Sequence, residues 1–337
     1  MTQQAELNLC LIGCGHMGRL HARNLAFDAR VARLTLCDAS EDTVTALVDD
    51  LSGGSATLSP GQVDTALDGA FDGFIIASPA HLHLEQVIRA SKTGAYIFCE
   101  KPLGTDFAAI EAATAALAPY AEQIQVGFNR RFDPQMAALK ARIAAGDVGP
   151  IEQLHIVSRD HRPPTIAQLK NSAGLIAETA IHDFDMLRWL LDGEIAQISC
   201  YGGALINPEY ADHGHIDTAT MVLISETGQQ IVIQNSWRAA NGYDQRIEAF
   251  GPKGRLTVDN PTADLVRFED RSGMRHGQIA DDWSTRYIAS YCVEMQAFVH
   301  SVAKHQSTMP NLYDAIAASK LAFLAQRSLR EGRAIDF

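Results

Sequence analysis

A glycine-rich turn between an apolar run and an amphipathic segment limits the fold of this chain more than any other feature. The run Leu7–Ile12 is short and apolar, as buried strands are, and it leads directly into Gly13-Cys14-Gly15-His16-Met17-Gly18. Met17–Asp28 then carries apolar side chains at helical spacing. In such a turn the first glycine permits the tight bend, the second lets a pyrophosphate approach the backbone, and the third lets the helix pack closely. The order strand, turn, helix therefore predicts a dinucleotide-binding unit.

The same alternation of strand-like and helical segments continues to residue 126. Further strands are predicted at Leu34–Cys37, Phe74–Ala77, Tyr96–Cys99 and Ile124–Val126. The helices predicted between them are Glu41–Leu51, His83–Lys92 and Phe107–Leu117. Strands and helices of these lengths form parallel sheets with helices on both faces, joined by right-handed crossovers. We therefore predict an α/β fold that begins with a doubly wound Rossmann domain over residues 1–126.

The pattern changes after a helix predicted at Pro134–Ala145, where the cluster Gly146–Pro150 interrupts it. The following segments are β-rich, and they are Ile151–Val157, Ile195–Leu205, Thr218–Ile224, Gln230–Trp237, Gln245–Phe250 and Gly254–Val258. Helices are predicted at Leu175–Leu191, Trp283–Lys304 and Tyr313–Arg330, because each segment has a stripe of apolar side chains at helical spacing. Residues 127–337 are thus predicted to form an α+β domain with a large, mainly antiparallel open sheet, for substrate binding and oligomerisation.

Charge and cysteine usage restrict the class of partner. The chain has 28 Lys and Arg against 40 Asp and Glu, a formal charge of -12 that repels nucleic acid and anionic lipid. It has no apolar run near the roughly 20 residues that cross a bilayer. We expect a small-molecule ligand, with neither nucleic acid nor membrane as partner. Six scattered cysteines without CxxC pairs, and a first strand too early for a signal peptide, favour a reducing cytoplasm. Neither HExxH nor Cys/His zinc spacing occurs, so a metal is not implied.

An acidic residue after the second predicted strand points to the type of dinucleotide. Asp38 lies about 20 residues beyond Gly18, where a carboxylate accepts hydrogen bonds from the adenosine ribose. The same charge would repel a 2′-phosphate, so the sequence favours NAD over NADP. The alternative role for Asp38 is a turn or helix N-cap, although Ser40 is the better N-cap candidate.

Several further motifs resemble one known family. They are Ser78-Pro79-Ala80-His81-Leu82-His83, Glu100-Lys101-Pro102-Leu103, Gly127-Phe128-Asn129-Arg130-Arg131-Phe132-Asp133, Ser158-Arg159-Asp160, His182-Asp183-Phe184-Asp185 and Gly242-Tyr243-Asp244-Gln245-Arg246. In order across nearly the whole chain, they resemble the glucose-fructose oxidoreductase, inositol dehydrogenase and MocA (Gfo/Idh/MocA) family, and within it most closely the inositol 2-dehydrogenase branch.

The resemblance implies oxidation of a secondary hydroxyl of an inositol-like cyclic polyol or sugar, with hydride transfer to NAD. It implies His182 as the general base, Lys101 as the cation beside the alkoxide, and Glu178 as the carboxylate that supports both. The imidazole of His182 and the ammonium of Lys101 would meet beside the nicotinamide. The Lys101-Pro102 bond is expected to be cis, as a hypothesis. Inositol dehydrogenases of this branch carry aspartate where this chain has Glu178, four residues before the histidine, so a different substrate or a shifted geometry is expected.

The resemblance also implies the remaining site residues. The cofactor residues are Gly13, Gly15, His16, Met17, Gly18, Asp38, Ser78, Pro79, His83, Glu100 and Lys101. The substrate residues are Arg130, Asp160, His161, Asp185 and Tyr243. Each has an ordinary alternative: His182 could be structural, Lys101 a solvated turn lysine, Glu178 an exposed helix glutamate, and the pocket residues structural ion pairs.

Two other functions stay open at this point. One is a sugar-active enzyme that oxidises its substrate transiently with tightly bound NAD, for glycoside cleavage or coupled oxidoreduction. The other is a non-catalytic, dinucleotide-gated regulator, which would not need both a base and a cation. Members of the family bury the corresponding open sheet face between subunits. The resemblance therefore implies a homo-oligomer, either a dimer or a tetramer.

Overall fold

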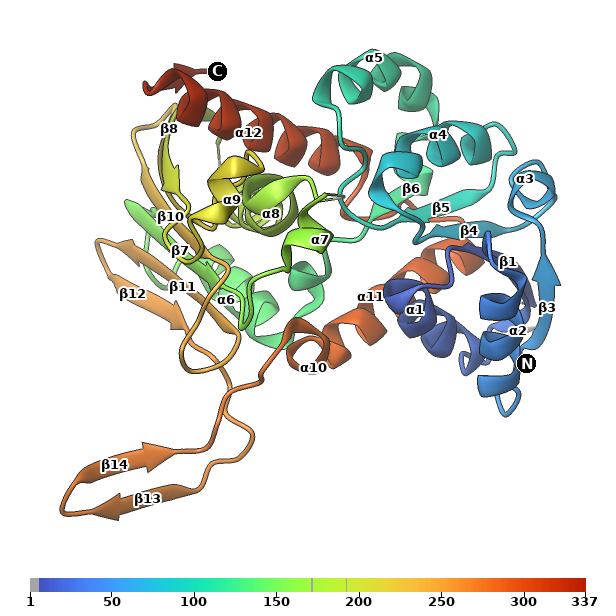
Figure 1. The fold of residues 1–337 in the computed structure, drawn as a ribbon, viewed down its shortest axis with the longest axis horizontal. Helices are drawn as coiled ribbons and strands as arrows, with labels where there is room; N and C mark the ends of the chain where they lie inside the picture. Colours follow the sequence, from blue (N-terminus) through green and yellow to red (C-terminus); the bar gives the residue numbers. More distant parts are fainter. Residues whose placement is uncertain (1–5, 171, 192) are drawn as a thin grey trace. The chain divides into compact units, whose positions relative to one another are not determined.

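A six-stranded parallel sheet forms the centre of the first half of the chain (Figure 1). The computed structural model describes residues 6–170, 172–191 and 193–337. The strands are β1 (Leu7–Ile12), β2 (Val31–Cys37), β3 (Thr57–Gly61), β4 (Gly73–Ile76), β5 (Tyr96–Cys99) and β6 (Ile124–Val126). Their order is β3-β2-β1-β4-β5-β6, with every neighbouring pair parallel. This order, which reverses direction between β1 and β4, confirms the predicted doubly wound fold.

The helices between these strands begin where the sequence provides caps. They are α1 (His16–Ala26), α2 (Glu41–Asp50), α3 (Val63–Ala66), α4 (Ala80–Ser91) and α5 (Phe107–Leu117). The side chain of Ser40 accepts a hydrogen bond from the Thr43 backbone N–H, which confirms it as the N-cap of α2. Asp106 caps α5 in the same way, through the N–H of Ala108. β3 was not predicted, because this edge strand is half-exposed, contains Pro60 and shows no apolar run.

The chain divides into two compact units, and the first includes a distant helix. The first unit comprises residues 1–129 and 289–319, and the second comprises residues 130–288 and 320–337. α11 (Ile288–Lys304) contributes Met295, Phe298, Val299 and Val302 to the core that contains β1 and β2. The division therefore does not follow a single point along the chain, because the apolar stripe of α11 is buried against the parallel sheet.

The second unit contains a seven-stranded sheet in the order β12-β11-β7-β10-β9-β8-β15. Its strands are β7 (Gln153–Arg159), β8 (Ile195–Gly203), β9 (Thr218–Ser225), β10 (Gln230–Ser236), β11 (Asp244–Gly251), β12 (Gly254–Val258) and β15 (Ile335–Asp336). Only β7 and β10 are parallel among these pairs. The predicted, mainly antiparallel sheet is thus confirmed.

The alternation of side chains divides this sheet into a packed face and an open face. Met221, Leu223 and Ile233 are fully buried on the packed face. On the other face Tyr201 is 66% and Val222 is 37% exposed. The helices of the second unit are α6 (Pro134–Ala144), α7 (Ile166–Leu169), α8 (Ile181–Leu190), α9 (Glu209–Asp212) and α10 (Trp283–Arg286). α12 (Leu312–Glu331) begins in the first unit and ends in the second.

Two predicted helices differ from the structure, and one hairpin was missed. The segment predicted as Leu175–Leu191 begins with a π-helical turn, Ile176–Ala180, before α8. The segment predicted as Trp283–Lys304 is divided at Tyr287 into α10 and α11. A hairpin of β13 (Arg267–Asp270) and β14 (Gly273–His276) extends away from the sheet that contains β11 and β12 (Figure 1). Within the described ranges, no helix is both long and apolar enough to traverse a lipid bilayer.

Candidate active site

The glycine turn lies at the carboxyl ends of β1 and β4, where the sheet order reverses. Gly13 has φ of 95°, and a Cβ there would lie 2.5 Å from both the Ala77 O and the Ser78 N. A Cβ on Gly18 would lie 1.7 Å from the Gly13 carbonyl oxygen. Side chains at these two positions would therefore force the turn open. Around Gly15 nothing lies within 4 Å of the Cβ position, so a ligand has access to the backbone.

The first turn of α1 is suited to an anion. His16, Met17 and Gly18 form this turn, and the N-cap Gly15 supplies no side-chain cap. An 11-residue helix carries partial positive charge at its N-terminus, where N–H groups bind phosphate. The residues present thus fit the pyrophosphate of a dinucleotide.

Asp38 is held beside this turn by two backbone hydrogen bonds. Its Oδ2 accepts from the Cys14 N–H at 2.7 Å, and its Oδ1 accepts from the Ser40 N–H at 3.0 Å. The half-buried carboxylate follows β2, which neighbours β1, and this position fits a ribose-binding acid. Burial, together with the charge of Asp38, raises the pKa of Cys14 to about 12. The Cys14 thiol therefore stays protonated and is no nucleophile near neutral pH.

The segments that follow β4 and β5 are joined through a buried histidine. His83 Nε2 lies 2.8 Å from the Ser78 carbonyl oxygen, and Nδ1 lies 2.8 Å from the Pro102 carbonyl oxygen. Ser78 Oγ donates to Gln86 Oε1 at 2.6 Å. The structure thus places the ring of His83 between two backbone carbonyls, while Pro79 is exposed as the N-cap of α4.

Lys101 and Glu100 follow β5 directly. The Lys101-Pro102 peptide bond is cis, which confirms that hypothesis. Lys101 is half-buried, whereas Glu100 is buried and bonded to His21. The resemblance implied Glu100 as a cofactor residue. In the structure its carboxylate has a hydrogen-bond partner within the chain, His21.

Glu178 lies in the π-helical turn before α8, not in a continuous α-helix. Its Oε1 accepts from the Ala173 N–H at 2.7 Å, and its Oε2 accepts from Ser172 Oγ at 2.8 Å. His182 is half-buried in the first turn of α8. Glu178 and His182 are four residues apart, but the geometry of an α-helical i, i+4 pair does not apply to them, because a π turn has wider hydrogen-bond spacing than an α-helix. Such turns are frequent at functional sites.

Two of the predicted substrate residues form buried ion pairs. Arg130 Nη1 lies 2.6 Å from Asp183 Oδ1. Arg131 Nη2 lies 2.5 Å from Asp185 Oδ1. Ser158 Oγ and Asn235 Nδ2 also donate to Asp183, each at 2.6 Å. Arg130 and Asp185 therefore hold strands and helices of the second unit together, whatever further contacts they make.

The remaining predicted substrate residues lie around β7 and β11. Asp160 Oδ2 accepts from Thr179 Oγ1 at 3.3 Å, which connects it to the π turn. The Nδ1 atom of half-buried His161 is enclosed and has no hydrogen-bond partner in residues 6–170, 172–191 and 193–337. The ring of buried Tyr243 lies edge-on to that of Tyr287, with centroids 5.9 Å apart. Burial raises the pKa of Tyr243 well above its usual value.

Tyr287 and Arg286 were missed by the sequence analysis. Arg286 Nη1 lies 2.6 Å from Asp133 Oδ2, and its guanidinium lies 4.7 Å from the centroid of the Tyr287 ring. The hydroxyl of Tyr287 is buried and has no hydrogen-bond partner within the described part of the chain. Both residues lie inside the single helix predicted at Trp283–Lys304, and the apolar periodicity of that segment gives no sign that it is divided at Tyr287.

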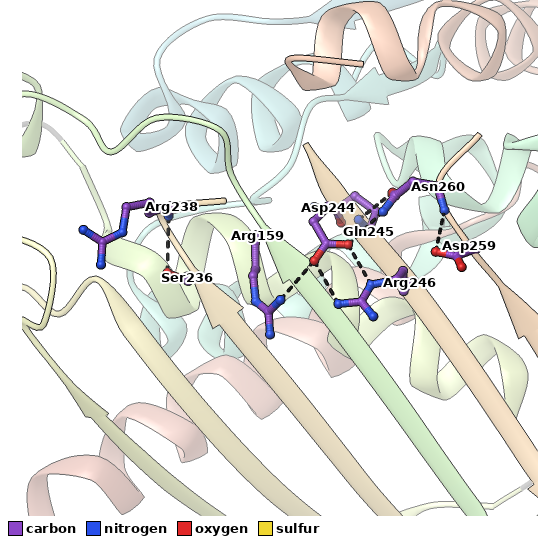
Figure 2. Close-up of polar contacts among 8 residues, drawn as sticks. All are labelled: Arg159, Ser236, Arg238, Asp244, Gln245, Arg246, Asp259 and Asn260. Atoms are coloured by element: carbon purple, nitrogen blue, oxygen red, sulfur yellow. Dashed lines mark hydrogen bonds and ion pairs between the residues drawn. The ribbon is translucent and has the colours of Figure 1, made fainter. Parts of the chain in front are cut away.

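Two of the motifs meet on paired strands. Asp244 on β11 lies opposite Arg159 on β7. Its carboxylate lies between Arg159 and Arg246 (Figure 2), with N–O distances of 3.1 Å and 2.7 Å. The side-chain amide of Asn260 also donates to it at 2.7 Å. The hydrogen bonds from Arg246 and Asn260 and the charge of Arg159 outweigh burial and lower the pKa of Asp244. These motif residues thus support the sheet.

Comparison with known proteins matches both halves. Residues 7–128 match the model of the oxidoreductase family with an NAD-binding Rossmann fold, and residues 136–257 match the GFO/IDH/MocA C-terminal domain. The chain is 32% identical to an inositol 2-dehydrogenase of Rhizobium meliloti, over 97% of this chain and 98% of that protein.

Solved structures agree over the whole length. A myo-inositol dehydrogenase from Corynebacterium glutamicum has a TM-score of 0.91 at 31% identity, covering 98% of this chain and 99% of that one. A scyllo-inositol dehydrogenase from Lactobacillus casei, with bound NAD(H) and scyllo-inositol, has a TM-score of 0.89 at 25% identity, with coverage of 98% and 99%. The fold, the glycine turn and these similarities together show that the chain belongs to the Gfo/Idh/MocA oxidoreductase family.

Proposed function

We propose that this protein is an NAD-dependent dehydrogenase that oxidises a secondary hydroxyl of an inositol-like cyclic polyol. The observation that carries the proposal is the placement of Asp38 and Lys101 in the first unit. Asp38 is fixed beside the glycine turn, and Lys101 follows β5 at the carboxyl edge of the same parallel sheet. Ligands of such sheets bind at this edge. The similarity to inositol dehydrogenases over nearly the whole chain supports the choice of substrate.

Each side chain has a stated task in this proposal. NAD, when bound, accepts a hydride from the carbon that carries the hydroxyl. His182 takes the hydroxyl proton, a task suited to imidazole near neutral pH. Lys101 stabilises the developing alkoxide, and Glu178 supports both electrostatically. Around them, Arg130, Asp160, His161, Asp185 and Tyr243 remain proposed as the polar lining that recognises substrate hydroxyls.

The relatives and solved structures described above favour net hydride transfer over the two alternatives. They carry names of dehydrogenases, and none of those names refers to glycoside cleavage or regulation. Net oxidation releases NADH, which distinguishes it from transient oxidation with retained cofactor.

The test is NADH formation with a panel of inositols, aldoses and sugar acids. We expect reduction of NAD by at least one inositol, and absence of NADH with every member would refute the proposed function. His182→Ala should lose roughly 100- to 10,000-fold in turnover, because general base catalysis contributes about that much. NADH binding should remain nearly intact. His300→Ala, an exposed histidine on α11, is the matched control and should keep full activity.

We also propose that the open face of the second sheet joins copies of this chain in a dimer or tetramer. Tyr201 and Val222 lie on this face, and bare apolar sheet surface favours association. Light scattering should give a mass above that of one chain, and Val222→Glu should lower it. A monomeric wild type would refute the proposal.

A cytoplasmic location is likewise proposed, supported by six free cysteines, of which only Cys292 is not fully buried.

A further inference from the structure

A buried histidine and a buried glutamate form a pair next to Lys101. His21 Nε2 lies 2.7 Å from Glu100 Oε1, although 79 residues separate them in the chain. The side chain of His21 is 0% exposed and that of Glu100 is 8% exposed. Because a carboxylate accepts but cannot donate when ionised, the imidazole Nε2–H donates to it. Among the residues that the structure describes, none offers a hydrogen-bond partner to the buried Nδ1 atom of His21.

The surroundings leave this pair little freedom. The rings of Phe98 and Tyr291 contact the imidazole edge-on, with centroids 5.0 Å and 6.0 Å away. On the other side, a Cβ at Gly127 would lie only 3.0 Å from Glu100 Oε2. The carboxylate is thus confined between the histidine and the backbone of Gly127.

The second carboxylate oxygen is directed at the next residue in the chain. Glu100 Oε2 accepts from the Lys101 backbone N–H at 3.2 Å. The backbone N–H of Glu100 itself donates to the Ile76 carbonyl oxygen at 2.9 Å. Beyond Lys101, the Pro102 carbonyl oxygen lies 2.8 Å from His83 Nδ1. The backbone on both sides of Lys101 is therefore anchored by buried side chains of the same unit.

Stability alone does not account for the pair. Taking a carboxylate and an imidazole out of water costs free energy that one hydrogen bond between them offsets only in part, and an enclosed nitrogen without a partner adds a further cost. A fixed backbone does matter for a long, flexible lysine, because displacements near 1 Å at a reacting centre change rates strongly.

We propose that Glu100 and His21 are positioning residues that hold the Lys101 backbone, and so direct its ammonium toward the reacting hydroxyl. The inference rests on the proposed function in that it takes Lys101 to act on the substrate. It differs from a cofactor-binding role for Glu100, because the polar atoms of that side chain face His21 and the Lys101 backbone.

The primary test is Glu100→Gln, measured in three ways. The amide retains one acceptor oxygen, so it cannot serve His21 and the Lys101 N–H with separate oxygens. We expect kcat to fall by roughly 10- to 100-fold, with the Kd of NAD nearly unchanged. In the protein without cofactor, hydrogen–deuterium exchange of the peptide over residues 99–103 should be faster. Leu25→Ala, in the core of the same unit, is the control: it lowers the melting temperature but should leave kcat and this exchange unchanged.

A double-variant cycle separates positioning from an independent effect. If Glu100 acts through Lys101, Glu100→Gln should lower kcat no further in a Lys101→Ala background. Should Glu100→Gln not fold, His21→Gln and His21→Leu replace it, since a glutamine N–H can still donate to the carboxylate whereas leucine cannot. We then expect kcat in the order wild type, His21→Gln, His21→Leu.

Three results would overturn the proposal: wild-type kcat in Glu100→Gln or His21→Leu, a further loss in the Lys101→Ala background, or unchanged exchange over residues 99–103. Failure of the proposed function is distinguishable, because it would appear as an inactive wild type. The exchange measurement would still report whether Glu100 anchors Lys101.

Discussion

Replacement of Asp183 by asparagine should strongly destabilise the second unit. The carboxylate is 0% exposed and accepts three hydrogen bonds at 2.6 Å, from Arg130 Nη1, Ser158 Oγ and Asn235 Nδ2. Asparagine offers one acceptor oxygen instead of two and turns an N–H₂ group toward these donors. It also leaves the guanidinium of Arg130 buried without its carboxylate. Breaking a buried pair in this way costs about 3–5 kcal/mol.

Tryptophan fluorescence reports this unit selectively. All three tryptophans of the chain, Trp189, Trp237 and Trp283, lie within residues 130–288 of the second unit. Urea unfolding followed by fluorescence should therefore show a lower midpoint for Asp183→Asn. Glu248→Gln, which removes the partner of Arg255 in a solvent-exposed pair of the same unit, is the control and should change stability by about 0–1 kcal/mol.

The reasoning also predicts a partial rescue. Because most of the penalty comes from a stranded charge, adding Arg130→Met to Asp183→Leu should recover part of the stability lost in Asp183→Leu alone. An Asp183→Asn protein within about 1 kcal/mol of wild type would refute the argument, as would further destabilisation by Arg130→Met.

The other predictions concern the glycine turn, the cofactor and two titrating groups. Gly18→Ala should weaken NAD binding measured by calorimetry, because its Cβ would lie 1.7 Å from the Gly13 oxygen, while Gly53→Ala, with nothing within 4 Å, should not. Asp38→Ala should weaken the binding of NAD roughly 10- to 100-fold and reduce the preference for NAD over NADP. Unchanged affinities for both dinucleotides would contradict the role of Asp38 in binding the ribose. The pKa of Asp244 is lowered in the folded state, so its stabilisation is present above about pH 4 and lost below it. The difference in unfolding free energy between wild type and Asp244→Asn should therefore be present at neutral pH and disappear in acid. An equal difference at neutral and at acidic pH would argue against this. Since the pKa of Cys14 is about 12, iodoacetamide should label half-exposed Cys292 before Cys14, as followed by peptide mass spectrometry.

The helices and turns recognised from sequence are those with strong local signals. Gly13 is required by its positive φ and by the backbone of Ala77 and Ser78, and Ser40 caps α2 through its own hydroxyl. Edge strand β3 and the hairpin of β13 and β14 lack such signals, because their side chains are exposed and follow no burial pattern. The π turn that carries Glu178 also escaped prediction, since an α-helix and a π turn share the same apolar residues.

The candidate site was predictable as a set of residues, but not as a set of contacts. Motif residues such as Lys101 and Asp38 occupy the carboxyl edge of the parallel sheet, which follows from strand order alone. Sequence could not show that Asp183 collects three donors. Nor could it show that Glu100 pairs with His21, because the two are 79 residues apart.

What the amino-acid order determined by itself was the alternation of elements, the glycine turn and the class of cofactor, because each depends on neighbouring residues and their periodicity. What only the tertiary structure decided was the partner of each buried charge and the packing of α11 into the first unit. Periodicity establishes which face of a segment is buried, whereas the identity of the group it meets depends on how distant segments pack together.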